Sequence, residues 1–197
     1  MSKSVALHIC CAICLVAPRE ELHSKGYKIQ GVFFNPNIQP YDEYLKRLYT
    51  LKNYIKSNPI KSISSSKYNA FSHLDIYKTT NARRNEFCAK CYELRLRKAA
   101  ITAKSNKIKH FSTTLLSSPF QDKLMIREIG AKLEKEFKLT FIDSNKWEKR
   151  HFESKKIIRN SGLYVQKYCG CIYSKMDMKA RKSALINTIK SEPKKIS

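Results

Sequence analysis

Hydrophobic residues occur along the chain in two patterns, as short apolar runs and as longer stretches in which every third or fourth residue is apolar. The short runs, rich in β-branched residues, predict strands, and the periodic stretches predict amphipathic helices. Tyr44, Leu48, Leu51 and Ile55, for example, lie on one face of a helix that ends before Pro59. The predicted strands cover residues 4–10, 27–35, 60–65, 110–116 and 139–143.

Predicted helices separate these strands along the chain. They cover residues 17–25, 42–58, 88–104, a stretch around 125–133, and 174–190, whereas residues 66–84 are polar and carry no clear pattern. Strands that alternate with helices predict a parallel sheet with helices on both faces. The sequence therefore predicts one Rossmann-like α/β domain over residues 1–190, followed by a disordered basic tail at 191–197.

The segment HICCAIC, residues 8–14, follows the first predicted strand. Ligands of parallel α/β sheets bind in the crevice at the carboxyl ends of the strands, where nucleotide-binding proteins carry glycine-rich turns. This turn carries three thiols and no glycine, and the whole chain has five glycines. A phosphate cradled by glycines is therefore not expected, which argues against an enzyme that activates its substrate with ATP.

The seven cysteines of the chain lie in three short segments. Because each cysteine lies within three residues of another, the simplest interpretation is one thiolate-rich site assembled from distant parts of the chain. About four thiols suffice for one tetrahedral metal ion or one ordinary iron-sulfur cluster, so the surplus favours a reactive site over a structural one. The segments contain Cys10, Cys11 and Cys14, then Cys88 and Cys91, and finally Cys169 and Cys171.

The spacing of the thiols leaves several chemistries open. Cys88 and Cys91 share a face at the expected start of a helix, whose N-terminus favours thiolate, and they suit zinc, an iron-sulfur cluster or a dithiol. The adjacent Cys10 and Cys11 suit an iron-sulfur cluster better than a zinc ribbon. The Cys-Gly-Cys segment at 169–171 can close into a strained, easily reduced disulfide. A structural zinc site built from some of the cysteines is the alternative.

The net charge of the chain indicates a class of binding partner. The chain carries 39 Lys and Arg against 16 Asp and Glu, a net charge of +23, which is typical of proteins that bind nucleic acids. A general bias toward lysine is the alternative, since no single basic segment stands out. A hydrophobic content of 42% and a charged content of 28% indicate a folded protein rather than a disordered one.

The N-terminal apolar run is too short, and too soon followed by charged residues, for a secretory signal. No stretch approaches the roughly 18 apolar residues that a membrane-spanning helix needs. We therefore expect a cytoplasmic protein that does not bind membranes. Structural disulfides seldom persist in that compartment, which leaves metal binding or redox chemistry for the cysteines.

Other residues near the thiols have more than one interpretation. His8, on the first strand, is expected to be a hydrogen-bonded core residue rather than a metal ligand. Arg95, four residues after Cys91, can contact a phosphate, offset thiolate charge or lie in solvent. Thr113 and Thr114 are expected to point into the crevice at the strand ends, although hydroxyls at a turn also have local uses.

Five segments together resemble one family, the cysteine-rich, cobalamin-independent epoxyqueuosine reductases of the QueH type. The segments span nearly the whole chain in family order, with every cysteine in register. The chain departs from the usual pattern at Ile13, where the family has proline, and at Asn69, where it has aspartate. The segments are HICCAIC at 8–14, FFNPNIQPYDEYLKR at 33–47, CAKCYELRL at 88–96, FSTTLLSSPFQD at 111–122 and GLYVQKYCGCIYS at 162–174.

The resemblance implies the last step of queuosine synthesis, in which the epoxide of epoxyqueuosine at the tRNA wobble position becomes an alkene. It also implies a 4Fe-4S cluster and a fold similar to the adenine nucleotide alpha hydrolase-like class. Loss of the epoxide oxygen as water consumes electrons and protons, and a structural zinc ion supplies no electrons. The implied partners are the anticodon stem-loop of the tRNA and an unidentified electron donor.

From the resemblance we expect distinct roles for the thiols. Cys169 and Cys171 are expected to form a catalytic redox pair, with Cys14 either near that pair or on a second, mononuclear metal such as iron. Tyr92 and Arg95 are expected to contact the substrate, and loop bases to stack on aromatic residues. A non-enzymatic, zinc-stabilised RNA-binding module is the alternative. The expected ligands of the 4Fe-4S cluster are Cys10, Cys11, Cys88 and Cys91.

Overall fold

The computed structural model describes residues 3–65, 68–80 and 84–191 of the chain. Within these residues the strands are β1 (Ser4–His8), β2 (Lys28–Phe33), β3 (Ser62–Ser65), β4 (His110–Thr113) and β5 (Thr140–Phe141). They form one parallel sheet in the order β3-β2-β1-β4-β5. The chain therefore has the predicted Rossmann-like α/β arrangement, in which the strand order reverses between β1 and β4.

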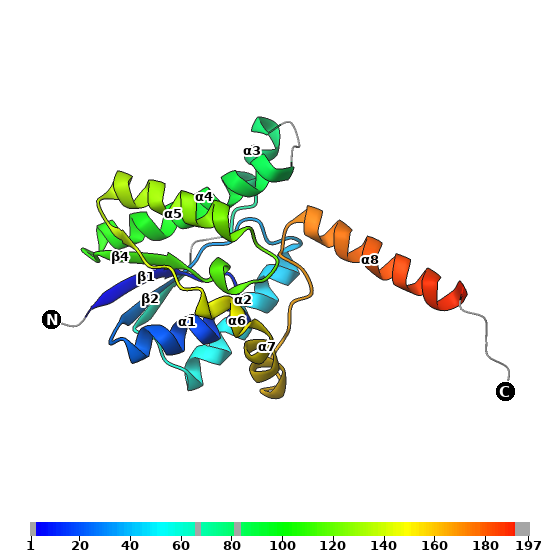
Figure 1. Ribbon diagram of the computed structural model, residues 1–197, viewed down its shortest axis with the longest axis horizontal. Coiled ribbons are helices and arrows are strands. Elements are labelled where there is room, and N and C mark those ends of the chain that lie inside the picture. The colour runs from blue at the N-terminus through cyan, green and yellow to red at the C-terminus, as the bar shows by residue number, and fades with distance from the viewer. Residues whose placement is uncertain (1–2, 66–67, 81–83, 192–197) are drawn as a thin grey trace.

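Helices lie on both faces of this sheet. Figure 1 shows α4 and α5 over one face and α1 and α2 over the other, with α6 and α7 packed against α1. None of the helices in the described residues combines the length and the apolar composition that a bilayer crossing requires. The helices are α1 (Ala12–Ser24), α2 (Tyr41–Ser57), α3 (Phe71–Thr79), α4 (Arg84–Ser105), α5 (Lys123–Phe137), α6 (Lys146–Lys149), α7 (His151–Asn160), α8 (Ile172–Ser191) and the short 3₁₀ helix η1 (Thr114–Ser117).

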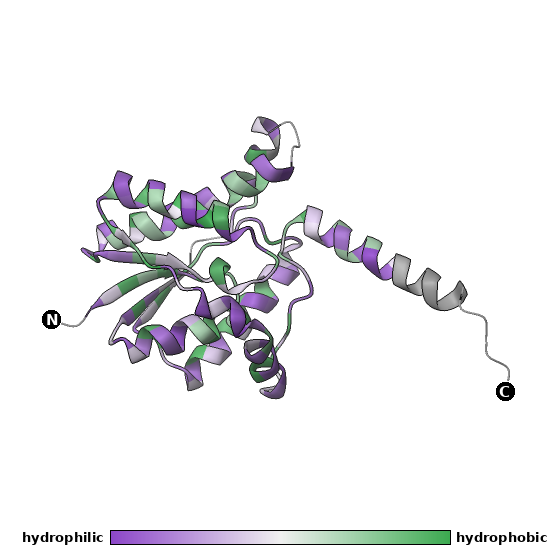
Figure 2. Cartoon of the chain, viewed as in Figure 1, coloured by the Kyte–Doolittle hydropathy of each residue, from purple (hydrophilic) through white to green (hydrophobic). Residues whose placement is uncertain are grey.

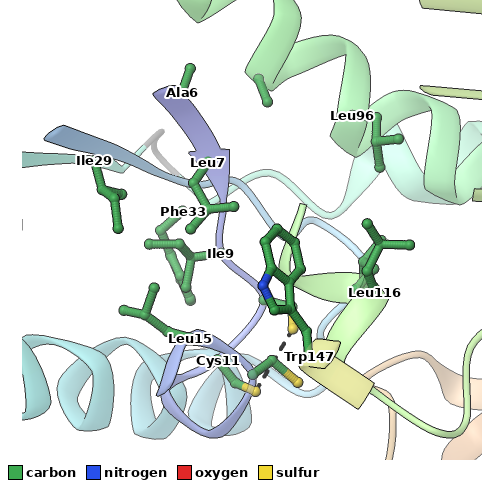
Figure 3. Packing of buried hydrophobic residues seen from close by; sticks show 14 of the residues in the cluster. Ala6, Leu7, Ile9, Cys11, Leu15, Ile29, Phe33, Leu96, Leu116 and Trp147 are labelled. Carbon is green, nitrogen blue, oxygen red and sulfur yellow. Dashed lines mark hydrogen bonds between the residues drawn. The ribbon is translucent and has the colours of Figure 1, made fainter. Parts of the chain in front are cut away.

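The hydrophobic core fills the space between the sheet and its helices. Hydrophobic residues concentrate along the inner strands, and hydrophilic residues lie on the outer faces of the helices (Figure 2). Ile9, Leu15, Leu116 and Trp147 are almost fully buried and pack in one cluster with Cys11 (Figure 3). Each buried side chain of this size contributes about 2 kcal/mol to folding. The first thiols of the chain thus lie at the edge of a rigid core.

Several predicted boundaries differ from the structure. Helix α1 begins at Ala12 rather than at 17, so Cys14 lies in its first turn. Helix α4 already includes Arg84, so Cys88 and Cys91 lie beyond its first turn and not at its start, as the sequence had indicated. Strand β4 ends at Thr113, because the Thr113 side chain accepts a hydrogen bond from the Leu115 amide and begins η1 there.

Three helices and the end of the chain also bear on the predictions. Helix α3 was not predicted because residues 66–84 are polar without a clear period. Helices α6 and α7 were not predicted in the basic segment after residue 146. The final helix, α8, starts beside α4, where Arg84 and Asp177 form an ion pair, and runs to Ser191. Residues 192–197 of the predicted tail lie outside the described residues.

Candidate functional site

The carboxyl ends of β1, β2 and β4 bring polar side chains together. His8 pairs with Thr113 in the sheet, and its Nδ1 shares a hydrogen bond of 2.8 Å with the Thr113 hydroxyl. Its Nε2 lies 3.2 Å from Oδ1 of Asn35. Complete burial lowers the pKa of His8 to about 4, because an imidazolium would lose its hydration. His8 is therefore a neutral, hydrogen-bonded core residue, as predicted.

Three thiols gather directly after β1. The sulfurs of Cys10, Cys11 and Cys14 are buried and lie within 4.8 Å of one another, close enough to share one metal ion. The Thr114 hydroxyl donates to Sγ of Cys10 at 3.3 Å, and Nε2 of Gln166 donates to Sγ of Cys11 at 2.7 Å. Hydrogen bonds with Cys11 and Cys14 hold the pKa of Cys10 well below that of a free thiol. This donor set suits a thiophilic metal such as iron or zinc.

The other four thiols lie around α4 and the start of α8. Burial raises the pKa of Cys91 to about 11 and also raises that of Cys88. The predicted stabilisation of their thiolates by a helix N-terminus is wrong, because both lie beyond the first turn of α4, to which that effect is confined. A hydrogen bond from Cys171 lowers the pKa of Cys169 to about 7, and the same contact raises the pKa of Cys171. Cys169 is therefore the more readily ionised member of the pair and the better nucleophile.

Two adjoining cavities contain all seven thiols. A cavity of about 550 Å³ is lined by Cys10, Cys11 and Cys14, and we call it the triad cavity. A second cavity of about 430 Å³ is lined by Cys88, Cys91 and Cys171, and we call it the helix cavity. Cys169, Phe120, Gln121, Lys167 and Tyr168 line both cavities and form their common wall. Cys169 thus lies between the two groups of thiols, and Cys14 lies with Cys10 and Cys11.

Arg95 and Tyr92, which were predicted to contact the substrate, both line the helix cavity. Burial alone would lower the pKa of Arg95, but the nearby charges of Cys91, Cys169 and Cys10 raise it. Only 1% of Arg95 is exposed, which favours a role in offsetting thiolate charge over contact with a phosphate. The Tyr92 hydroxyl donates to Oε1 of Gln121 at 2.9 Å, so its ring is held as part of the cavity wall.

Comparison with known proteins identifies the family of this chain. A model of the family described as epoxyqueuosine reductase QueH matches residues 5–177, which include every cysteine of the chain. The chain belongs to the QueH family. The predicted resemblance is therefore confirmed.

Relatives named epoxyqueuosine reductase QueH occur in distant bacteria. The protein of Helicobacter pylori is 32% identical over 178 residues, which cover 85% of this chain and 48% of that protein. The protein of Dehalococcoides mccartyi is 28% identical over 180 residues, 90% of this chain and 95% of that protein. The protein of Thermotoga maritima is 28% identical over 190 residues, 90% and 93% respectively. The chain thus spans about half the length of the Helicobacter QueH and nearly all of the other two.

This QueH chain also contains a buried ion pair that sequence reasoning missed. Nε of Arg47 on α2 donates to Oε1 of Glu43 at 2.7 Å, and only 2% and 6% of the two residues are exposed. The two Nη groups of Arg47 donate to the carbonyl oxygens of Cys169 and Tyr168, each at 2.9 Å. The Tyr164 hydroxyl donates to the second oxygen of Glu43 at 2.6 Å. Arg47 therefore fixes the backbone that carries Cys169.

We expect Arg47→Gln to lower the free energy of unfolding by about 3 kcal/mol, because it leaves the Glu43 carboxylate buried without its cation. Urea denaturation followed by circular dichroism measures the loss. The matched control is Arg97→Gln, because Arg97 pairs with Glu93 and Glu136 at the surface, where between 30% and 42% of each side chain is exposed. A much smaller decrease is expected there. Equal decreases for the two variants would contradict the role assigned to Arg47.

Gly170, between Cys169 and Cys171, is the second constraint on this QueH segment. Its φ is +129°, and a Cβ there would lie 2.9 Å from Cγ1 of Ile38. We expect Gly170→Ala to lower the free energy of unfolding by about 2 kcal/mol or more, through strain and overlap together. Gly162→Ala is the control, since its φ is +69° with no atom near the new Cβ, and strain alone costs about 1 kcal/mol. Equal losses in urea denaturation would show that the overlap contributes nothing.

Proposed function

We propose that the protein reduces the epoxide of epoxyqueuosine, at the wobble position of tRNA, to the alkene of queuosine. The family supports this activity, because its members share the name epoxyqueuosine reductase. The observation that carries it is the position of Cys169, which lines both thiol cavities and interacts with Cys171. A substrate arm that enters either cavity meets this thiol.

The Cys169 and Cys171 thiols can supply the electrons and protons that the proposed reaction consumes. Both carbon–oxygen bonds of the epoxide break, the oxygen leaves as water, and a carbon–carbon double bond forms. This reduction consumes a pair of electrons and a pair of protons, which two thiols release when they form one disulfide. An external reductant, such as a dithiol or an electron-carrier protein, then returns the disulfide to two thiols.

An iron-sulfur cofactor fits the donor set of this site. We propose that Cys10, Cys11, Cys88 and Cys91 bind a 4Fe-4S cluster and that Cys14 binds a second, mononuclear iron. The buried sulfurs of Cys10 and Cys11 lie close enough to share a metal site, and Cys88 and Cys91 line the adjoining cavity. The buried guanidinium of Arg95 offsets the charge of thiolate ligands. When bound, such a cluster supplies one-electron transfer. The resemblance to QueH, rather than the geometry, distinguishes iron-sulfur from zinc here.

The substrate contacts proposed for Tyr92 and Arg95 differ in kind. The Tyr92 ring forms part of the wall of the helix cavity and provides a surface for the arm that carries the epoxide. Arg95 acts through charge, since it is almost fully buried. Because its proposed substrate is tRNA, we propose that the enzyme works in the cytoplasm.

Protein purified without oxygen tests this function. We expect a brown protein that contains iron and sulfide and that converts epoxyqueuosine to queuosine in tRNA when dithionite is supplied. Nucleosides from digested tRNA, separated and identified by mass, report the conversion. A colourless protein with one zinc ion and no conversion would instead support the zinc-stabilised RNA-binding module.

A further inference from the structure

Three aromatic rings lie together beside the triad cavity. Phe120 follows η1, and His151 and Phe152 begin α7. The His151 ring contacts both phenylalanines, with centroid distances of 6.1 Å to Phe120 and 5.6 Å to Phe152 and nearly perpendicular planes. Phe120 and Phe152 are 72% and 70% exposed. Two exposed phenylalanines that contact the same histidine form an apolar patch, and such patches mark surfaces used for binding.

Two cations without ion pairs in the described residues lie near these rings, on α7. Lys155 and Arg159 lie one turn apart on α7, and both line the triad cavity. Among the described residues no carboxylate lines this cavity, and neither cation forms an ion pair. Arg150, just before α7, differs because it pairs with both Glu20 and Glu153. The charge at the mouth of the cavity is thus free to attract an anion.

We propose that Phe120, Phe152, Lys155 and Arg159, which lie around the buried His151, form the surface that binds the anticodon loop. Unstacked bases of the loop stack on the two exposed phenylalanine rings, and Lys155 and Arg159 contact the adjoining phosphates. We call these residues the loop platform. This inference rests on the proposed function, since it assigns to that function the face from which the RNA approaches.

Exposed rings beside unpaired cations favour RNA over an acidic protein. Single-stranded nucleic acid carries flat bases, which stack on exposed aromatic rings, and phosphates, which bind positively charged side chains. This surface offers both kinds of group. An acidic electron carrier would use the cations but has no need of two exposed rings. The location agrees with RNA as well, because Phe120 also forms part of the wall that contains Cys169. A nucleotide next to the platform is therefore adjacent to the thiols.

The test measures the affinity of the full chain for a fluorescent anticodon stem-loop RNA that lacks the epoxide, by anisotropy at several salt concentrations. Phe120→Ala and Phe152→Ala are each expected to weaken binding by about tenfold and to leave the salt dependence unchanged. Lys155→Ala and Arg159→Ala are each expected to reduce the slope of log affinity against log salt by about 0.7, as loss of one phosphate contact does. A duplex without the loop should not respond to the phenylalanine variants.

Matched controls come from the exposed side of α2. Tyr49 is 60% exposed, and Lys52 and Lys56 lie one turn apart there without an ion pair in the described residues. Tyr49→Ala, Lys52→Ala and Lys56→Ala should each leave affinity and slope nearly unchanged. Losses as large as those at the platform would show non-specific binding by the net charge and would overturn the proposal.

The remaining outcomes separate this inference from the proposed function. Because the RNA lacks the epoxide, a protein without reductase activity still tests the platform. If platform variants bind RNA normally, the inference fails even when the enzyme is active. Normal RNA binding together with slower reduction by a protein donor would assign this surface to the donor instead.

Discussion

Cys169→Ser is expected to decrease the conversion of epoxyqueuosine to queuosine by roughly a thousandfold or more, because a hydroxyl cannot form the disulfide that releases the electrons. The substitution removes a single sulfur from the wall between the two cavities. Bound iron, sulfide and affinity for the stem-loop RNA should be unchanged. Single-turnover conversion, measured by nucleoside analysis, gives the result.

Cys171→Ser and the double variant serve as controls for this prediction. When two residues act as one unit, replacing either one costs as much activity as replacing both. All three variants should therefore show the same residual rate. An active Cys171→Ser variant would contradict the pair, because a disulfide requires both thiols. Loss of iron in Cys169→Ser would assign Cys169 to metal binding rather than to electron transfer.

Cys10→Ser and Cys11→Ser are expected to produce the second large effect, a loss of bound iron and sulfide to below about a tenth of the normal content. Both sulfurs lie in the buried triad and are proposed cluster ligands. Colour, iron and sulfide in anaerobically purified variants measure the effect. Full iron and sulfide in both variants would contradict the proposed ligand set.

Cys14→Ser is the matched comparison within the same triad. If Cys14 binds a mononuclear iron, the variant should lose part of its iron and keep all of its sulfide, because such an iron carries no sulfide. Loss of sulfide equal to that of Cys10→Ser would make Cys14 a cluster ligand instead. The ratio of sulfide to iron therefore distinguishes the two roles, without any measurement of activity.

The strands and the position of the first thiols could be predicted from sequence because their pattern is local. Short apolar runs mark β1 and β2, and a parallel sheet requires that Cys10 and Cys11 follow β1 at the ligand-binding edge. The start of α1 was missed because its first turns are buried on every side, so Ile13 and Leu15 show no amphipathic period. The first turns of α4 were also missed, and there the ring of Phe87 packs against His73 and Tyr173, contacts between separate segments that local spacing does not indicate.

The site, too, was predicted only in part, because some of its residues are defined by contacts between distant segments. The cysteines are recognisable by chemistry, whereas Glu43 and Arg47 form an i,i+4 pair that is typical of an exposed helix. Their burial depends on the loop that carries Cys169, more than a hundred residues later in the chain. The division of the thiols between two cavities also arises from packing, which no spacing along the sequence specifies.

The central claim is that the Cys169 and Cys171 thiols provide the electrons that convert epoxyqueuosine to queuosine. The most direct measurement is a single turnover without external reductant, in which reduced, anaerobic protein in excess meets tRNA that carries epoxyqueuosine. Mass spectrometry of both products should find one queuosine formed for each new Cys169–Cys171 disulfide. Queuosine without this disulfide would contradict the account.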